Sequence, residues 1–117
     1  CYLDMLEDEI NSVDAVLNYI DKLKEKKGVF DDEVIQKDLI HSYFDLELAL
    51  ASLCILLRKM SENMFIHIDE EIRRDINSII HSNKFEYHDH EKIYVYSKKG
   101  KEPIELSRLM QFARSIL

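Results

Sequence analysis

Arg74 and His81 are the two residues of this chain whose types and spacing best suit chemistry. Seven positions are close to two turns of an α-helix, so both side chains leave the same face, roughly 10 Å apart along the axis. A guanidinium holds a phosphate through parallel hydrogen bonds. An imidazole titrates at about pH 6.5 in model peptides, so it can accept or release a proton near neutrality. The pair is therefore suited to binding a phosphodiester and moving its protons.

The segment 70–81 that carries this pair predicts a helix with two unlike faces. One side gathers the isoleucines Ile72, Ile76, Ile79 and Ile80, and the other gathers Glu70, Arg74, Asn77, Ser78 and His81. Asn77 and Ser78 lie between the arginine and the histidine, where they could orient the imidazole or a phosphate oxygen. Asp75 lies about 100° round the helix. We therefore expect Asp75 to order Arg74, or an arginine of a partner, rather than to react.

The composition favours a chain of long helices. A length of 117 residues suits one domain, 1–117, with a single core. Two glycines and one proline are too few for a sheet with many turns. The chain starts at Cys1 without an initiator methionine, so we expect the native beginning to be missing.

The charge and the cysteines limit the class of protein. A net charge of −7 argues against nucleic-acid binding by the whole surface, but it leaves room for a local basic pocket. Cys1 and Cys54 form no disulfide framework and no signal peptide is visible, so we expect a cytoplasmic protein. The longest apolar run, 46–57, is interrupted by polar residues and is shorter than a membrane span. It predicts a buried core helix, and we expect no membrane association.

Periodicity places the elements that must position the Arg74 and His81 pair. Apolar residues spaced by three and four predict helices over 2–26, from Asp31 or Asp32 to about 60, over 69–82, and from about 106 to the C-terminus. Alternation predicts a strand over 92–97, and a turn at 98–101 would return the chain as a short strand over 102–104. The connection 61–68 carries Met64, Phe65, Ile66 and Ile68, which we expect to pack. Residues 83–90 show no clear period.

The motif and its context resemble the HEPN domain family. HEPN domains carry an arginine and a histidine on one helix with four to six residues between them. Here six residues separate Arg74 from His81, and Asp75 takes the polar position that is often asparagine. The resemblance covers the whole chain as a pattern of elements, but the residue-level match is confined to these three positions. It implies an all-α fold, a four- to five-helix bundle with a small β-hairpin before the last helix.

The resemblance also implies a function. HEPN ribonucleases need no metal or other cofactor and act as homodimers that join two Arg/His pairs in one composite site. Arg74 would then bind the scissile phosphate and His81 would act as base or acid, leaving a 2′,3′-cyclic phosphate and a 5′-hydroxyl. Arg73, Lys84 and His88 would contact the RNA. The setting would be a toxin or phage-defence effector, with an antitoxin or other regulatory protein as a further partner.

Other interpretations stay open at this point. Arginine and histidine on the polar side of a helix are often merely solvated, and a HEPN-like domain can serve as a non-catalytic dimerisation or interaction domain of a larger defence protein. His88 and His90 could share a metal ion on a strand, but no third ligand stands at a standard spacing, so a solvated loop is the better interpretation. Tyr94 and Tyr96 could stack bases, but they more often pack a hairpin onto its domain.

Overall fold

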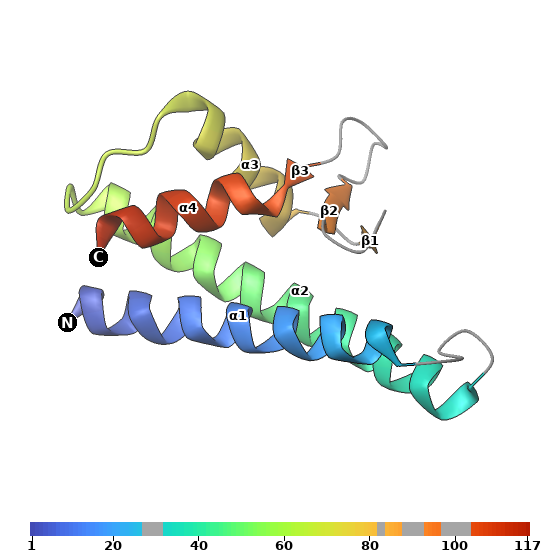
Figure 1. The fold of residues 1–117 in the computed structure, drawn as a ribbon. Helices are drawn as coiled ribbons and strands as arrows, with labels where there is room; N and C mark the ends of the chain where they lie inside the picture. The colour runs from blue at the N-terminus through green and yellow to red at the C-terminus, as the bar shows by residue number, and fades with distance from the viewer. Residues whose placement is uncertain (27–31, 82–83, 88–92, 97–103) are drawn as a thin grey trace.

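The computed structural model describes residues 1–26, 32–81, 84–87, 93–96 and 104–117 (Figure 1). The order of elements is α1 (Tyr2–Glu25), α2 (Glu33–Glu62), α3 (Glu70–Ile80), β1 (Lys84–Tyr87), β2 (Ile93–Tyr96), β3 (Ile104–Glu105) and α4 (Leu106–Ile116). This part of the chain is mostly helical, which confirms the all-α prediction at the level of fold class.

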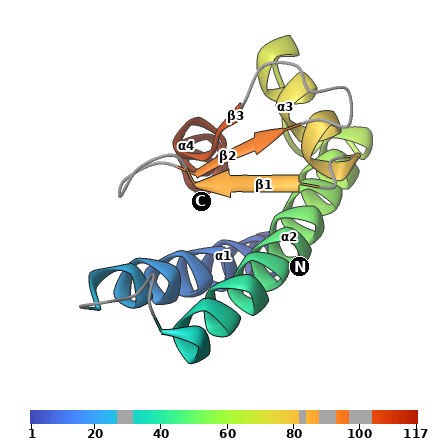
Figure 2. The ribbon, with the colours of Figure 1, turned by 90° about the vertical axis from the view of Figure 1, so that its right-hand side faces the viewer.

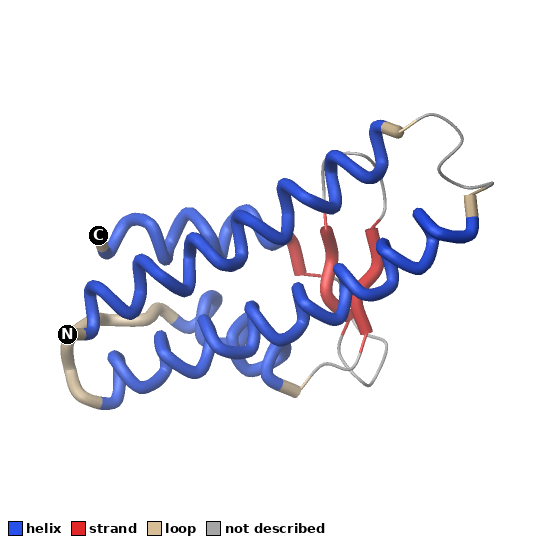
Figure 3. Tube along the Cα trace, turned by 90° about the horizontal axis from the view of Figure 1, so that it is seen from below, coloured by secondary structure: helices blue, strands red, loops and turns tan. Residues whose placement is uncertain are grey.

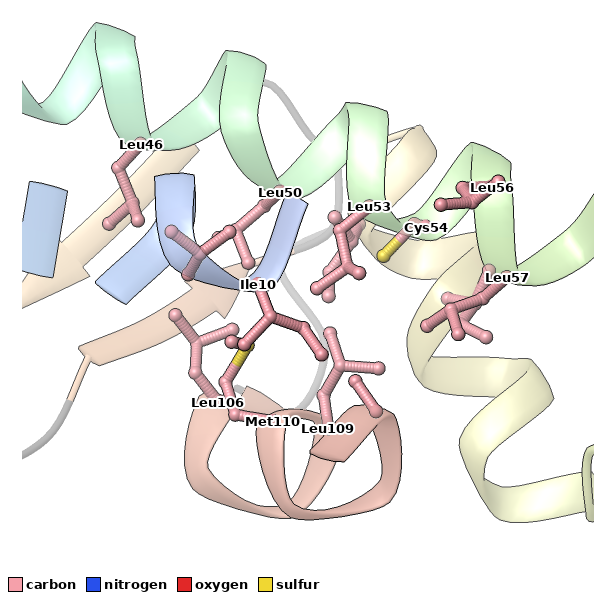
Figure 4. Close-up of a cluster of buried hydrophobic side chains, with 14 of the residues drawn as sticks. Ile10, Leu46, Leu50, Leu53, Cys54, Leu56, Leu57, Leu106, Leu109 and Met110 are labelled. Atoms are coloured by element: carbon pink, nitrogen blue, oxygen red, sulfur yellow. The ribbon is translucent and has the colours of Figure 1, made fainter. Parts of the chain in front are cut away.

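The helices form two layers. Figure 3 shows α1 and α2 antiparallel and side by side, and Figure 1 shows α3, α4 and the strands above this pair. The long helix α2 packs against both α1 and α3, and α4 packs against α1 and α3. Figure 4 shows Leu50, Leu53 and Leu57 of α2 turned toward Ile10 of α1 and Leu109 of α4. All these leucines are fully buried, so one side of the run 46–57 lies at the centre of the core, as its sequence predicts, whereas Leu48 and Ile55 of the same run are exposed.

A local signal fixes where α2 begins. The Asp32 carboxylate accepts hydrogen bonds from the backbone N–H groups of Val34 (2.9 Å) and Ile35 (3.3 Å) and so caps α2. Asp32 is one of the two caps that the sequence offers.

The apolar character of α2 extends beyond the run 46–57. Among the described helices, α2 is long and apolar enough to cross a membrane by length and composition, with a mean hydropathy of 1.5 over its best window. Of that window, 39% is buried inside the fold. A central core helix meets the same criteria.

The connection from α2 to α3 departs from the prediction that all four of its large apolar residues pack. Ile68 is buried and Ile66 is partly buried, but Met64 and Phe65 are exposed. The reason is the helix end: Met64 takes a positive φ of 63°, and the N–H of Phe65 donates to the carbonyl of Met60 at 2.9 Å. This is a Schellman ending, and it turns the backbone outward before Ile66. The Phe65 ring meets the Tyr2 ring edge-on, with centroids 5.0 Å apart.

The strands form one antiparallel sheet in the order β1-β2-β3 (Figure 2). Phe85 pairs with Val95 in the β1–β2 register, and Val95 also pairs with Ile104 in the β2–β3 register. β1 falls in residues 83–90, which show no clear period, so this strand is not among the elements that the sequence predicts. β1 is as short as β2 but lacks the β-branched residues Ile93 and Val95 that mark β2 in the sequence. Residues 98–101 lie outside the described part, so the hairpin turn stays a prediction.

Candidate functional site on helix α3

Helix α3 is fixed in rotation by its isoleucines. Asp69 caps it, because its carboxylate accepts a hydrogen bond from the N–H of Ile72 at 3.0 Å. Ile72, Ile76 and Ile79 are buried against the rest of the fold, and α3 packs on both α2 and α4. A helix held along one side presents its opposite side to solvent. The face that carries the Arg74 and His81 pair therefore points outward.

The structure places most of the predicted site residues on this outward face. Arg74, Asn77 and His81 are exposed, and Ser78 is half-buried. The helix ends at Ile80, earlier than the predicted residue 82, so His81 is its C-cap residue and donates its N–H to the Asn77 carbonyl at 3.1 Å. At His81 the backbone has φ −98° and ψ 2°. The ψ angle is no longer helical, so the helix does not continue through this residue.

The candidate RNA-contacting residues are placed unequally. Arg73 is exposed on α3 next to Arg74. Lys84 is the first residue of β1, three positions after His81, but only its backbone is described. His88 lies outside the described residues, and so does the candidate metal-binding pair His88 and His90. Within the described part of the chain, no cluster of three or more His, Cys, Asp or Glu side chains is arranged to hold a metal ion.

Asp75 has a partner that the sequence analysis did not identify. Its carboxylate is buried, and its Oδ2 atom accepts hydrogen bonds from Nε of Arg108 at 2.9 Å and from Nη2 of Arg108 at 2.6 Å. The remaining guanidinium nitrogen of Arg108 pairs with Glu71, one turn before Asp75 on α3. The expectation that Asp75 orders Arg74 is therefore corrected: Asp75 binds an arginine of α4 in its own chain.

The pairing of Asp75 with Arg108 joins α3 to α4. Its hydrogen bond to Asp75 is the main cause that raises the pKa of Arg108 above its ordinary value, so the guanidinium stays charged at every practical pH. An arginine that holds two carboxylates with three nitrogens also fixes the direction of the helix that carries them. Apolar packing and this ion pair together fix the orientation of α3, and with it the direction of its outward face.

The Arg74 and His81 side chains themselves are held by nothing that the structure describes. No hydrogen bond or ion pair among the described residues engages either of them, whereas Arg108 and Arg114 of α4 are both paired. A catalytic pair needs to be held within narrow limits of position. Within the described part of the chain, therefore, α3 supplies the direction of the two groups but not their final geometry.

Cys54 is excluded as a nucleophile of this site. It lies on the core side of α2, fully buried, and burial followed by the nearby Asp75 charge raises the pKa of its thiol to about 12. The thiolate is the reactive form, so Cys54 is inert at neutral pH.

The chain matches no family model, no curated protein and no solved structure.

Proposed function

We propose that this chain is a metal-independent endoribonuclease of the HEPN type, acting as a homodimer and serving as a toxin or phage-defence effector. The observation that carries the proposal is that Arg74 and His81 both lie exposed on one side of α3. The opposite side of that helix is anchored by buried isoleucines and by the Asp75–Arg108 pair. A rigid helix with one cation and one titratable group on its free face can meet a phosphodiester from solution.

The chemistry needs no metal because RNA carries its own nucleophile. One imidazole removes the proton of the 2′-hydroxyl, the 2′-oxygen forms a bond to phosphorus, and the bond from phosphorus to the 5′-oxygen breaks. A second, protonated imidazole gives its proton to the departing 5′-oxygen. The Arg74 guanidinium stabilises the charge on the pentacoordinate phosphorus. The products are a 2′,3′-cyclic phosphate and a 5′-hydroxyl.

The need for two imidazoles favours a homodimer. Among the described residues of one chain, His81 is the histidine on the α3 face, so the acid and the base come from two copies. Two copies meeting at this face would also bring both Arg74 side chains to one phosphate and hold side chains that have no partner among the described residues of one chain. Exposed Arg73 would extend the positive surface along the RNA.

The test is cleavage of a labelled RNA in EDTA by the wild-type chain and by Arg74→Ala and His81→Ala. Both variants should lose activity at least a hundredfold, since a general acid or base contributes about 10²–10⁴ and a donor that stabilises the charge of the transition state about 10²–10³. The wild-type products should carry a cyclic phosphate. Arg73→Ala is the matched control, because it removes an exposed arginine from the same helix and should only weaken RNA binding. Equal activity in His81→Ala and wild type would refute the mechanism.

A second candidate function is a non-catalytic dimerisation or interaction domain of a larger defence protein. The specific observation in its favour is that the outer side of α2 exposes large apolar side chains. Intact RNA after incubation with a folded wild-type chain, across many substrates, would favour this second function.

A further inference from the structure

The outer side of α2 carries an apolar stripe, here called the α2 stripe, formed by Ile40, Phe44, Leu48, Ala51 and Ile55. The spacing is four, four, three and four, which places all five on one line along the helix. This line is opposite the core side of α2. The exposed fractions of its large side chains are 55% for Ile40, 58% for Phe44, 70% for Leu48 and 49% for Ile55.

The neighbouring helix α1 shows what an ordinary solvent-facing side looks like in this protein. The line of residues 4, 8, 11, 15, 18 and 22 on its outward side carries charged and amide residues apart from Ala15, and all of them are exposed. α1 exposes large apolar side chains singly, at Leu3, Met5 and Tyr19, whereas α2 exposes a continuous line of them. The core uses only one of the two sides of α2, so the α2 stripe is available to a partner.

The charged residues beside the stripe limit which kind of partner surface can cover it. Asp45 and Glu47 flank the stripe on its two sides near its middle. Asp45 is exposed, and partial burial already raises the pKa of the Glu47 carboxyl. A flat lipid surface that covered Leu48 would also bury these two carboxylates, which is costly. A helix is narrow enough to cover the stripe and leave both of them in water.

The stripe is complementary to a reversed copy of itself. In an antiparallel pair centred between Leu48 and Ala51, Leu48 lies opposite Ala51 of the second chain, so a large side chain faces a small one. In the same register Phe44 lies opposite Ile55 of the second chain. The two-fold symmetry repeats each of these contacts, as a closed dimer requires.

The same register also pairs the charges at the ends of the stripe. Lys37 precedes the stripe by one turn, Glu62 follows it, and both are exposed on the same line. With the centre between Leu48 and Ala51, Lys37 lies opposite Glu62 of the second chain at both ends. At about 200 Å² for a fully exposed large apolar side chain, the stripe offers roughly 450 Å² per chain. Two stripes and four end residues reach the ~1,000 Å² of a specific interface.

We infer that the α2 stripe is the surface on which a second copy of this chain binds, antiparallel, with Lys37 of each chain facing Glu62 of the other. The interface does not rest on the proposed ribonuclease function, because none of its residues belongs to the outward face of α3. Its formation is measured without RNA.

The test is a charge exchange read by mass and by cross-linking. In a Cys1→Ser background, Leu48→Cys places one thiol near the two-fold axis, and mild oxidation should give a chain-to-chain disulfide. Lys37→Glu alone and Glu62→Lys alone should each lower the cross-linking yield, and the double variant Lys37→Glu/Glu62→Lys should restore it. Only the antiparallel register restores the yield, since it puts the two exchanged charges opposite each other again.

Light scattering gives the second reading. The wild-type chain should have at least twice the 13.9 kDa mass of one chain. Leu48→Glu should halve the measured mass, and Asn11→Glu on the outward side of α1 should leave it unchanged. Both positions are exposed, so both variants should keep the wild-type circular dichroism. A monomeric wild-type chain, or Leu48→Glu with unchanged mass, would overturn the inference. If that monomer bound phosphatidylcholine vesicles, the stripe would be a lipid-binding surface instead.

Discussion

The two arginines of α4 should differ sharply in their contribution to stability. Arg108 pairs with Asp75, and Arg114 pairs with Asp14 of α1. The arginines are similarly exposed, 43% and 48% of the side chain, but their carboxylate partners are not: Asp75 is 8% exposed and Asp14 is 35% exposed. The perturbation is therefore the same truncation at two sites, Arg108→Ala and Arg114→Ala. The two variants differ in the burial of the carboxylate that loses its partner.

Arg108→Ala leaves a buried carboxylate without its partner. Removing one member of a buried ion pair costs about 3–5 kcal/mol. Because Arg108 is itself partly exposed, water can enter its place and hydrate Asp75, so we expect about 2–3 kcal/mol for this variant. Arg114→Ala breaks a pair at the surface, where the cost is below about 1 kcal/mol.

The assay is urea unfolding followed by far-UV circular dichroism. A chain of this size should unfold with a slope of about 1.5 kcal/mol per molar urea, so Arg108→Ala should lower the midpoint by about 1.5 M and Arg114→Ala by less than about 0.7 M. The double variant Asp75→Leu/Arg108→Met should recover most of the loss, because apolar residues of similar volume replace a buried pair at little cost. Equal losses for the two arginine variants, or no recovery in the double variant, would refute the reasoning.

Three further predictions concern single residues. Met64→Gly should raise the free energy of unfolding by about 0.5–1 kcal/mol in the same urea assay, because only glycine takes a positive φ without cost; a less stable variant would contradict this. Cys1 should react with a thiol reagent at pH 8, whereas Cys54, whose pKa burial raises to about 12, should react only as fast as the protein unfolds; rapid labelling of both would disprove the burial argument. Burial, with a smaller effect of Asp21, raises the pKa of Tyr43 from 10.0 to about 12. The folded state therefore favours the neutral phenol, and this contribution to stability is present below pH 10 and is lost as the pH rises to about 12. The urea midpoint should therefore fall more between pH 10 and 12 in wild type than in Tyr43→Phe, and equal slopes would argue against it.

The sequence predicted the helices well because their determinants are local. Spacings of three and four, a cap such as Asp69, and the scarcity of glycine and proline act within a few residues of the helix that they define. The outward direction of Arg74 and His81 follows from the same periodicity once the isoleucine side of α3 is taken as buried. The limits of the helices are less certain, since Ile80 rather than residue 82 ends α3.

The candidate site shows where sequence reasoning stops. Arg108 lies 33 positions after Asp75, and nothing near either residue marks the other as its partner. The signal that could have pointed to it is an aspartate close to the apolar side of a helix, since a buried carboxylate needs a partner. Which arginine fills that role depends on how α3 and α4 meet.

What the sequence by itself determined is the set of helices, their caps and the sides that each helix presents. The tertiary structure decided which apolar side of α2 enters the core, which cation holds Asp75, and that β1 exists beside β2. The physical reason is the range of the interactions. Capping and periodicity join residues within one or two turns, whereas burial, strand pairing and buried ion pairs join residues whose separation along the chain carries no information about their distance in space.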